Sequence, residues 1–301
     1  MPQSKSLSHE LWKTVLPAVV LLAFFELALR GSQKSAEFLM GLGIFPLVSE
    51  FLAYTFGFVL INVPLLIAEK FFPAYNRTGR HEYWAGVRFW FASISFAFFW
   101  SKVAIVIGAQ VGIKPLFEWT LDTTSHTFLI ASAIVTWMLV FDLFYYWFHR
   151  FQHTIPLLWR FHRVHHSIVE MNCVTSYHHL LEDLLRYPFI TLPLAMIFKL
   201  DAPQLMFLSA VITVWGQYIH ADTAINFGKL HVLMIGTANH RLHHSPLQRY
   251  FNKNYSAFFT IWDRIFGTYQ NPEGADISRT GLTDLEPPKS LVEFAMMPFR
   301  K

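Results

Sequence analysis

Four long apolar runs constrain the fold of this 301-residue chain more than any other feature of its sequence. They cover residues 11–29, 44–68, 89–111 and 128–148, and few charged side chains interrupt them. Each run is about 20 residues long, the length of a helix that crosses the hydrocarbon core of a bilayer. Lipid offers no hydrogen-bond partner to a peptide group, so a single spanning segment must be helical. We therefore expect an all-α integral membrane protein with about four transmembrane helices.

The composition supports a membrane protein over a soluble one. Hydrophobic residues make up 53% of the chain and charged residues only 15%, whereas a soluble domain carries about a quarter charged residues. The net charge is +4, and basic residues near the ends of apolar runs suit anionic lipid or an acidic redox partner better than nucleic acid. The single cysteine, Cys173, excludes an intramolecular disulfide and a cysteine-based zinc or iron–sulfur cluster.

Lysine and arginine are unevenly distributed between the apolar runs. The 69–88 connection carries four of them, whereas the connections on either side carry two and one. The positive-inside rule then places the 69–88 connection and everything after residue 148 in the cytoplasm. We predict a multi-pass protein of the bacterial inner membrane or endoplasmic reticulum, with its active site on the cytoplasmic side.

The character of the chain changes after residue 148. Residues 149–186 are rich in histidine and arginine and predict helices that lie on or above the membrane as a histidine-rich cap. Two shorter apolar stretches follow at 187–200 and 203–219, which could be two full spans or a re-entrant hairpin. The predicted regions are an N-terminal transmembrane region (1–125), a catalytic domain (126–270) and a C-terminal tail (271–301).

Eight histidines fall into three groups with helical spacing. The groups are His149 and His153, then His162, His165 and His166, then His240, His243 and His244. Spacings of three and four residues bring side chains onto one face of a helix. The pattern H-R-x-H-H-S occurs twice, at 162–167 and 240–245. Neutral imidazole is a ligand for iron, zinc and copper, so the pattern predicts a metal site beside the membrane.

The number of histidines favours two metal ions, and iron is the metal we expect. With His220, which ends an apolar stretch, the candidates number nine. One catalytic zinc ion needs about three protein ligands, whereas two ions with four or five ligands each would use the whole set. Few carboxylates lie among the histidines, which argues against the Glu-x-x-His di-iron site of helix bundles. The chain also lacks the HExxH pattern of a metalloprotease.

Several further residues are candidates with two interpretations each. His220 could be a ligand or a helix cap. His178 and His179 are adjacent, so a helix would point them in different directions, and His179 lies three residues before Glu182. His179 could therefore be a tenth ligand or could fix a neighbouring ring.

A carbonyl or carboxylate group should meet the second nitrogen of each ligating ring and fix its orientation. Asp142, Glu182 and Asn239 lie near enough in the sequence to do so. Asp142 falls inside an apolar run, where an ionisable group is a functional candidate by default. It could equally be a structural partner of Arg150 or of a neighbouring helix.

The order of these motifs after several apolar runs resembles the fatty acid hydroxylase superfamily, in its sterol desaturase branch. The similarity covers roughly residues 128–269. It includes PLLWRFHRVHHS at 156–167, HLLE at 179–182, NHRLHHS at 239–245 and WDRIFGTY at 262–269. Leu180 stands where this branch usually has proline, and the stretch between His166 and His179 is about one residue shorter than is common.

This resemblance implies a helical membrane protein whose cytoplasmic cap holds two non-haem iron ions. It also implies oxidation of a lipid C–H bond that consumes O₂ and external electrons. The iron ligands implied by motif match are His149, His153, His162, His165, His166, His240, His243 and His244, with His220 as the usual additional ligand and His179 as a tenth candidate.

Two other functions are compatible with some of these features. A histidine-rich metal transporter or sensor would bind metal without redox catalysis, but it should place its ligands at mid-bilayer depth rather than after the spans. A membrane cytochrome needs only one or two axial histidines per haem. The chain carries no electron-carrier signature, so the donor (of cytochrome b5, ferredoxin or flavin reductase type) should be a separate protein. The lipid substrate, the choice between hydroxylation and desaturation, and the oligomeric state stay open.

Overall fold

The computed structural model confirms the predicted all-α class. It describes residues 46–75, 80–112, 115–118, 127–200, 202–225 and 228–300, together with isolated residues between 19 and 41. Within these ranges helices and irregular segments make up the chain, apart from one short parallel pair of strands, β1 (Phe117–Glu118) and β2 (Phe198–Lys199), and two isolated β-bridges. The first predicted span, 11–29, lies largely outside the described residues.

Three long helices dominate the described part of the chain. They are α2 (Pro46–Phe71), α3 (Arg80–Val111) and α4 (Thr127–Thr154). Their segments Pro46–Phe71, Tyr83–Gly108 and Ala131–Thr154 are long and apolar enough to cross a membrane. Three of the four predicted runs are thus confirmed as candidate spans. Helix α3 begins nine residues before its apolar run, because the polar turn at its start continues the helix without a breaking residue.

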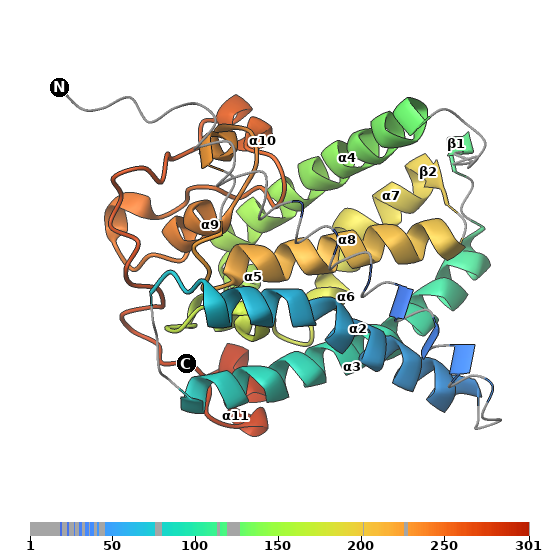
Figure 1. Cartoon of the computed structure of the whole chain (residues 1–301), viewed down its shortest axis with the longest axis horizontal. Coiled ribbons are helices and arrows are strands. Elements are labelled where there is room, and N and C mark those ends of the chain that lie inside the picture. Colours follow the sequence, from blue (N-terminus) through green and yellow to red (C-terminus); the bar gives the residue numbers. More distant parts are fainter. Residues whose placement is uncertain are drawn as a thin grey trace.

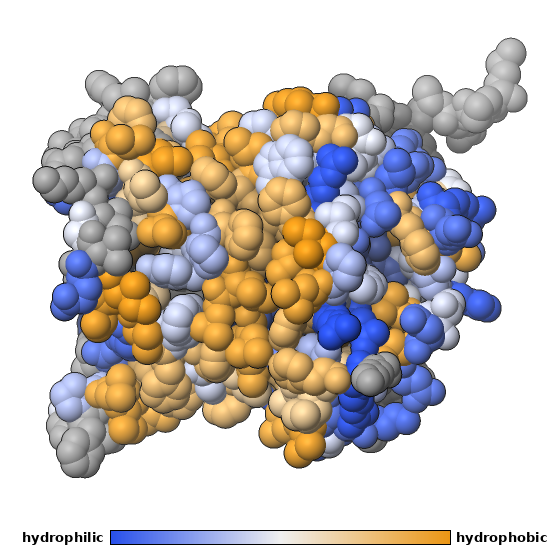
Figure 2. Space-filling view, turned by 180° about the vertical axis from the view of Figure 1, so that it is seen from behind, coloured by the Kyte–Doolittle hydropathy of each residue, from blue (hydrophilic) through white to orange (hydrophobic). Residues whose placement is uncertain are grey.

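The three helices cross one another but extend from the same end of the molecule, where the histidine-bearing segments lie (Figure 1). The end of α2, the start of α3 and the end of α4 all lie at this end, which we call the cap end (Figure 1). The end of α2, the start of α3 and the segments that carry the grouped histidines therefore share one side, as the charge pattern predicted, whereas the apolar residues 187–219 that were expected on the same side extend away from it. Figure 2 shows a broad apolar surface over the long helices and hydrophilic side chains gathered toward the cap end.

Short helical segments build the cap and a hairpin. They are α5 (Pro156–His166), η1 (Cys173–Thr175), α6 (Glu182–Arg186), η2 (Tyr187–Thr191), α7 (Leu192–Ile197), α8 (Ala202–His220), η3 (Gly228–Val232), α9 (Thr237–His243), η4 (Gln248–Tyr250), α10 (Ile261–Ile265), α11 (Leu291–Met296) and η5 (Met297–Phe299).

The two shorter apolar stretches form a helical hairpin that packs against α4. Leu194 of α7 and Leu208 of α8 lie in one core cluster with Trp137 and Phe141 of α4. The turn of the hairpin contains β2, which pairs with β1 in the connection between α3 and α4. The hairpin therefore extends from the cap to the opposite end of the long helices (Figure 1).

A close approach between α3 and η1 attaches the cap to the spans. A Cβ atom at Gly86 would come 2.8 Å from Thr175 Cγ2 and 3.2 Å from the Val174 carbonyl oxygen, so only glycine fits there without a shift. On the same side of α3, Phe89 stacks on Phe294 of α11 with ring centroids 4.8 Å apart. Both contacts involve the first turns of α3, where the span meets the cap.

Asp142 fixes the segment that follows the second HxxHH motif. Its fully buried carboxylate accepts hydrogen bonds from the backbone N–H groups of Ala257, Phe258 and Phe259, at 2.7, 3.1 and 2.8 Å. Asp263 adds bonds from the N–H groups of Tyr255 and Ser256. Two buried carboxylates thus hold an irregular segment against α4.

Replacing Asp142 by alanine should destabilise the fold by at least about 3 kcal/mol, since each buried N–H group left without a partner costs about 1–3 kcal/mol. Asp142→Asn should lose less, because it retains one acceptor oxygen. The matched control is Asp183→Asn, whose partly exposed ion pair with Arg186 should contribute less than about 1 kcal/mol. Equilibrium unfolding in detergent micelles, followed by tryptophan fluorescence, would show the ranking. Equal losses for Asp142→Ala and Asp183→Asn would contradict it.

Candidate metal centre

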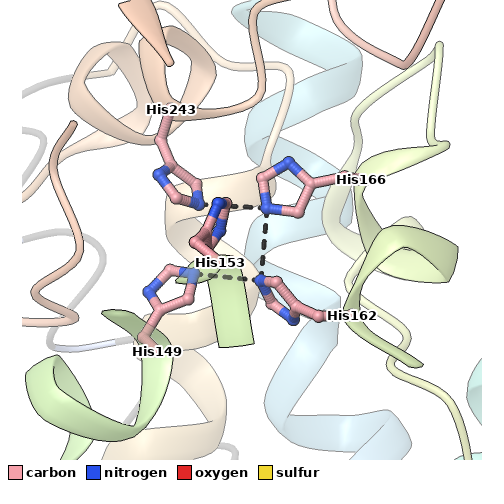
Figure 3. Close-up of side chains that lie close together, drawn as sticks. All are labelled: His149, His153, His162, His166 and His243. Atoms are coloured by element: carbon pink, nitrogen blue, oxygen red, sulfur yellow. Dashed lines mark hydrogen bonds between the residues drawn. The ribbon is translucent and has the colours of Figure 1, made fainter. Parts of the chain in front are cut away.

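Nine of the ten predicted ligands come together as two groups of imidazoles. Group A contains His149, His153, His162, His166 and His243, and group B contains His165, His220, His240 and His244. Within each group the potential ligand atoms lie within 4.8 Å of one another. Figure 3 shows the group A rings turned toward a common centre from three different helices, α4, α5 and α9.

The two copies of H-R-x-H-H-S divide their histidines between the groups in opposite ways. The copy on α5 gives its first and last histidines to group A and the middle one to group B. The copy at α9 gives its first and last histidines to group B and the middle one to group A. Residues four apart lie one turn apart on one helix face, while the residue between them points to an adjacent face. Each copy therefore contributes ligands to both groups.

Backbone carbonyl groups orient four of the rings. The Nδ1 atoms of His149, His243, His165 and His220 donate to the carbonyl oxygens of Tyr255, Lys253, Tyr177 and Gly216, at 2.7, 2.7, 2.9 and 2.6 Å. A carbonyl oxygen can only accept, so the hydrogen must sit on Nδ1. In a neutral ring this leaves the lone pair on Nε2, the nitrogen directed into the group.

The contact between His165 and His220 shows that the groups suit a cation. Their Nε2 atoms lie 3.1 Å apart, yet both rings already donate through Nδ1. Two lone pairs at this distance repel unless a positive ion lies between them. Nitrogen–metal bonds of about 2.0–2.1 Å put neighbouring ligands about 2.9–3.4 Å apart. The Nε2–Nε2 contacts in the two groups measure 3.0–3.2 Å, so the residues present fit bound metal ions.

Burial keeps the grouped imidazoles in the form that binds metal. It lowers the pKa of His220 and of His243 to about 4, and it lowers the pKa of His165, His166 and His244 well below the usual value, with neighbouring imidazoles adding to the effect. Imidazole must be neutral to coordinate a metal. At neutral pH these rings are therefore ready ligands.

Glu182 occupies the position predicted for a carboxylate that fixes a ring. Its Oε2 atom accepts from Gln152 Nε2 at 2.6 Å and lies 3.3 Å from Nδ1 of His162. The side chain is fully buried, and burial raises the pKa of this carboxyl to about 7. A metal ligand whose second nitrogen meets a carboxylate gains basicity and a fixed orientation.

Of the adjacent residues His178 and His179, it is His178 that lies beside the imidazole groups. The sequence analysis had favoured His179. His178 lies with His162 and Glu182 in a third cluster of potential ligands, and its ring stacks on that of His165 at a centroid distance of 3.9 Å. The two adjacent histidines follow η1 in an irregular segment, where successive side chains point to opposite sides. The sequence showed that they diverge, but gave no signal for which one faces inward.

His179 lies outside both groups, which corrects its prediction as a tenth ligand. Its Nε2 donates to the carbonyl oxygen of Ala295 at 3.1 Å, and its Nδ1 accepts from the N–H of Leu181 at 3.2 Å. Both nitrogens are therefore engaged by backbone. The ring fastens the C-terminal helix α11 to the cap instead of facing the imidazole groups.

Asp142 and Asn239 contact backbone rather than imidazole, so their predicted contact with the ligating rings is also corrected. Asp142 acts one step away, because it fixes the segment whose Tyr255 carbonyl receives the Nδ1 hydrogen of His149. Asn239 Oδ1 accepts from the N–H of Gly236 at the start of α9. Both residues position elements that carry or orient ligands.

Arg241, inside the second motif, is a buried residue that sequence reasoning missed. Its guanidinium donates to Asp222 Oδ1 at 3.3 Å and to the carbonyl oxygen of Met171 at 3.2 Å, and it lies over the Tyr75 ring. The carboxylate of Glu69 at the end of α2 accepts from the N–H groups of Asp222 and Cys173. This polar network connects the second motif to a span. The only sequence feature that pointed to Arg241 was the arginine that follows the first histidine in both copies of H-R-x-H-H-S.

Residues 134–268 match the model of the fatty acid hydroxylase family. This segment, a little under half of the chain, is similar to that family. It is 31% identical to human alkylglycerol monooxygenase over 181 residues, which is 56% of this chain and 40% of the relative. It is 28% identical to the ornithine lipid hydroxylase OlsE of Rhizobium tropici over 155 residues, 51% of this chain and 46% of that protein.

Human lathosterol oxidase is 29% identical over 147 residues, 48% of this chain and 47% of the relative. The chain thus spans less than half the length of these curated relatives. No solved structure gives a significant match.

Replacing His220 by alanine should remove about one metal ion per chain, because a group of four imidazoles would lose one of its donors. His179→Ala is the matched control and should retain the full metal content, since that ring faces backbone. Elemental analysis of the purified proteins measures both. Equal metal loss in the two variants would show that metal binding does not depend on whether a histidine belongs to group A or group B.

Glu182→Ala should weaken metal binding by about 10- to 100-fold, the usual effect of losing a carboxylate that orients a ligating histidine. The neighbouring Asp183→Ala removes the same chemical group from a partly exposed position beside Arg186 and should change the affinity little. Competition with a calibrated chelator gives the two dissociation constants. Indistinguishable constants would remove Glu182 from the site.

Proposed function

We propose that this protein is a membrane-bound non-haem di-iron oxidoreductase that uses O₂ and external electrons to hydroxylate or desaturate a lipid C–H bond. The observation that carries the proposal is the division of nine imidazoles, eight of them buried, into two adjacent groups, inside the segment that matches the fatty acid hydroxylase family. Group A and group B would each hold one iron ion. Bound iron supplies the ability to activate O₂, which side chains alone lack.

The ligand chemistry supports iron in both groups. Imidazole is a borderline donor that suits iron, copper and zinc. Five nitrogens in group A and four in group B exceed the three protein ligands of a typical catalytic zinc site. The two groups lie side by side, since the rings of His166 and His244 stack at a centroid distance of 4.2 Å. Adjacent sites of this kind suit reactions that need more than one electron.

The residues of this chain bind, orient and shield the site. Backbone carbonyls hold the rings of His149 and His165 with Nε2 directed inward. Glu182 fixes His162 in the same way. Except for the half-exposed His153, the grouped histidines are buried, so bulk water is kept away from the site. A dry site protects a strongly oxidising reaction from side reactions with solvent.

The position of the site beside candidate spans supports a lipid as the substrate. Helix α4 carries two ligands, His149 and His153, on its last turns and is apolar enough to cross a membrane. The three relatives act, by their names, on an alkylglycerol, an ornithine lipid and a sterol. A lipid chain loses little when it moves from the bilayer into an apolar site. Which lipid and which carbon react are questions for the experiment.

We place the cap end on the cytoplasmic side of a bacterial inner membrane or of the endoplasmic reticulum. The basic residues Lys70 and Arg80 flank the connection between α2 and α3 at the cap end, and cytoplasmic connections carry the excess of positive charge. Electrons would come from a separate protein of cytochrome b5, ferredoxin or flavin reductase type. The metal transporter stays the alternative, but the grouped ligands lie at the ends of spans and not at their middle.

Mass spectrometry of cellular lipids tests the proposal. Cells with the wild-type gene should contain a lipid 16 mass units heavier (hydroxylation) or 2 units lighter (desaturation) than cells with the His220→Ala variant, while cells with His179→Ala should match the wild type. Growth under ¹⁸O₂ should raise the first shift to 18 units. Unchanged lipids despite an iron-loaded protein would contradict the oxidase, and metal uptake by liposomes without lipid oxidation would favour the transporter.

A further inference from the structure

Group A reaches the surface through two partly exposed side chains, His153 and Trp159. Every histidine of group B is buried, whereas group A includes the half-exposed His153. The half-exposed side chain of Trp159 packs beside it, with ring centroids 5.1 Å apart. Trp159 also lies 5.4 Å from the ring of His166 and 6.3 Å from that of His162. An indole in contact with three histidines of group A thus lies between this group and the surface.

The surface around Trp159 has a small apolar centre. At the corner between α4 and α5, Ile155 is 42% exposed and Leu157 is 63% exposed. Trp159 lies one helical turn after Ile155, so the corner and the indole form adjoining surfaces. We call Ile155, Leu157, Trp159 and the exposed Arg160 the corner surface. Electron-transfer encounters bury less area than stable complexes, so they do not require an extensive apolar surface.

The charge of the corner surface selects the partner. Residues 143–166 contain three arginines, Arg150, Arg160 and Arg163, and no aspartate or glutamate. An apolar centre beside an exposed arginine, Arg160, is complementary to a protein with an acidic rim. Such complementarity raises the rate of encounter and makes it dependent on ionic strength.

We propose that the corner surface is the docking site of the external electron donor, a small one-electron carrier protein with an acidic rim, and that electrons enter group A past Trp159. This inference rests on the proposed function. Two encounters deliver two electrons, and each carrier molecule is oxidised by one electron. In a hydroxylation these two electrons and two protons reduce one atom of O₂ to water, while the other atom enters the C–H bond.

Anaerobic stopped-flow reduction of the iron-loaded full-length protein in detergent tests the route. Reduced ferredoxin and the reduced soluble domain of cytochrome b5 serve as acidic carriers, and dithionite serves as a small reductant without a docking site. Trp159→Leu should slow reduction by the carrier at least tenfold and leave the dithionite rate unchanged. The control is Trp84→Leu, since Trp84 is 63% exposed and its ring contacts Tyr83 rather than a histidine. It should react as the wild type does.

Charge reversal tests the docking separately. Arg160→Glu should lower the second-order rate constant about tenfold at low salt, and the difference should vanish at high salt because screening weakens exposed charges. Arg279→Glu makes the same change at an exposed residue outside 143–166 and should have less than a twofold effect. If Trp159→Leu loses iron, the comparison of Arg160→Glu with Arg279→Glu tests the docking site by itself.

Three results would overturn the inference. They are equal rates for Arg160→Glu and Arg279→Glu, carrier reduction of an iron-loaded Trp159→Leu at the wild-type rate, and a wild-type protein that dithionite reduces but neither carrier does. None of these results affects the lipid product. Failure of the proposed function would look different, because the wild-type protein would then hold no redox-active iron before any reduction is measured.

Discussion

The orientation of neutral imidazoles by backbone carbonyls is the constraint on which the site depends. Each such hydrogen bond consumes the Nδ1 hydrogen and directs the Nε2 lone pair inward, as in His149 and His220. Several lone pairs in one dry volume are mutually unfavourable without a cation. The repulsion between these lone pairs must therefore be offset by contacts elsewhere in the fold that hold the rings in place.

Buried polar groups do much of that work at a distance from the rings. Asp142 receives three backbone N–H groups and so fixes the segment whose carbonyls meet His149 and His243. Arg241 and Glu69 connect the second histidine motif to the end of α2 through Asp222. These charged groups lie where the long helices meet the cap. The stability of the spans and the geometry of the site are thus coupled.

The two groups differ in the exposure of their histidines. Every histidine of group B is buried, whereas His153 of group A is partly exposed and packs against Trp159. The duplicated motif gives ligands to both groups from each copy, so a shift of either helix would disturb both groups together. This sharing makes the pair of sites one unit. Every histidine of both groups lies within residues 134–268, the segment that matches the fatty acid hydroxylase model.

The sequence by itself determined the helical class, the three candidate spans in the described residues and the nine histidines of groups A and B. Hydrophobic length and helical spacing are local properties of the chain. Only the tertiary structure decided how these histidines divide into groups, and that His178 rather than His179 faces the site. It also decided that Asp142 and Asn239 bind backbone, since hydrogen-bond partners such as Ala257 lie more than a hundred residues away along the chain. Such contacts depend on how separate helices pack, which no local pattern encodes.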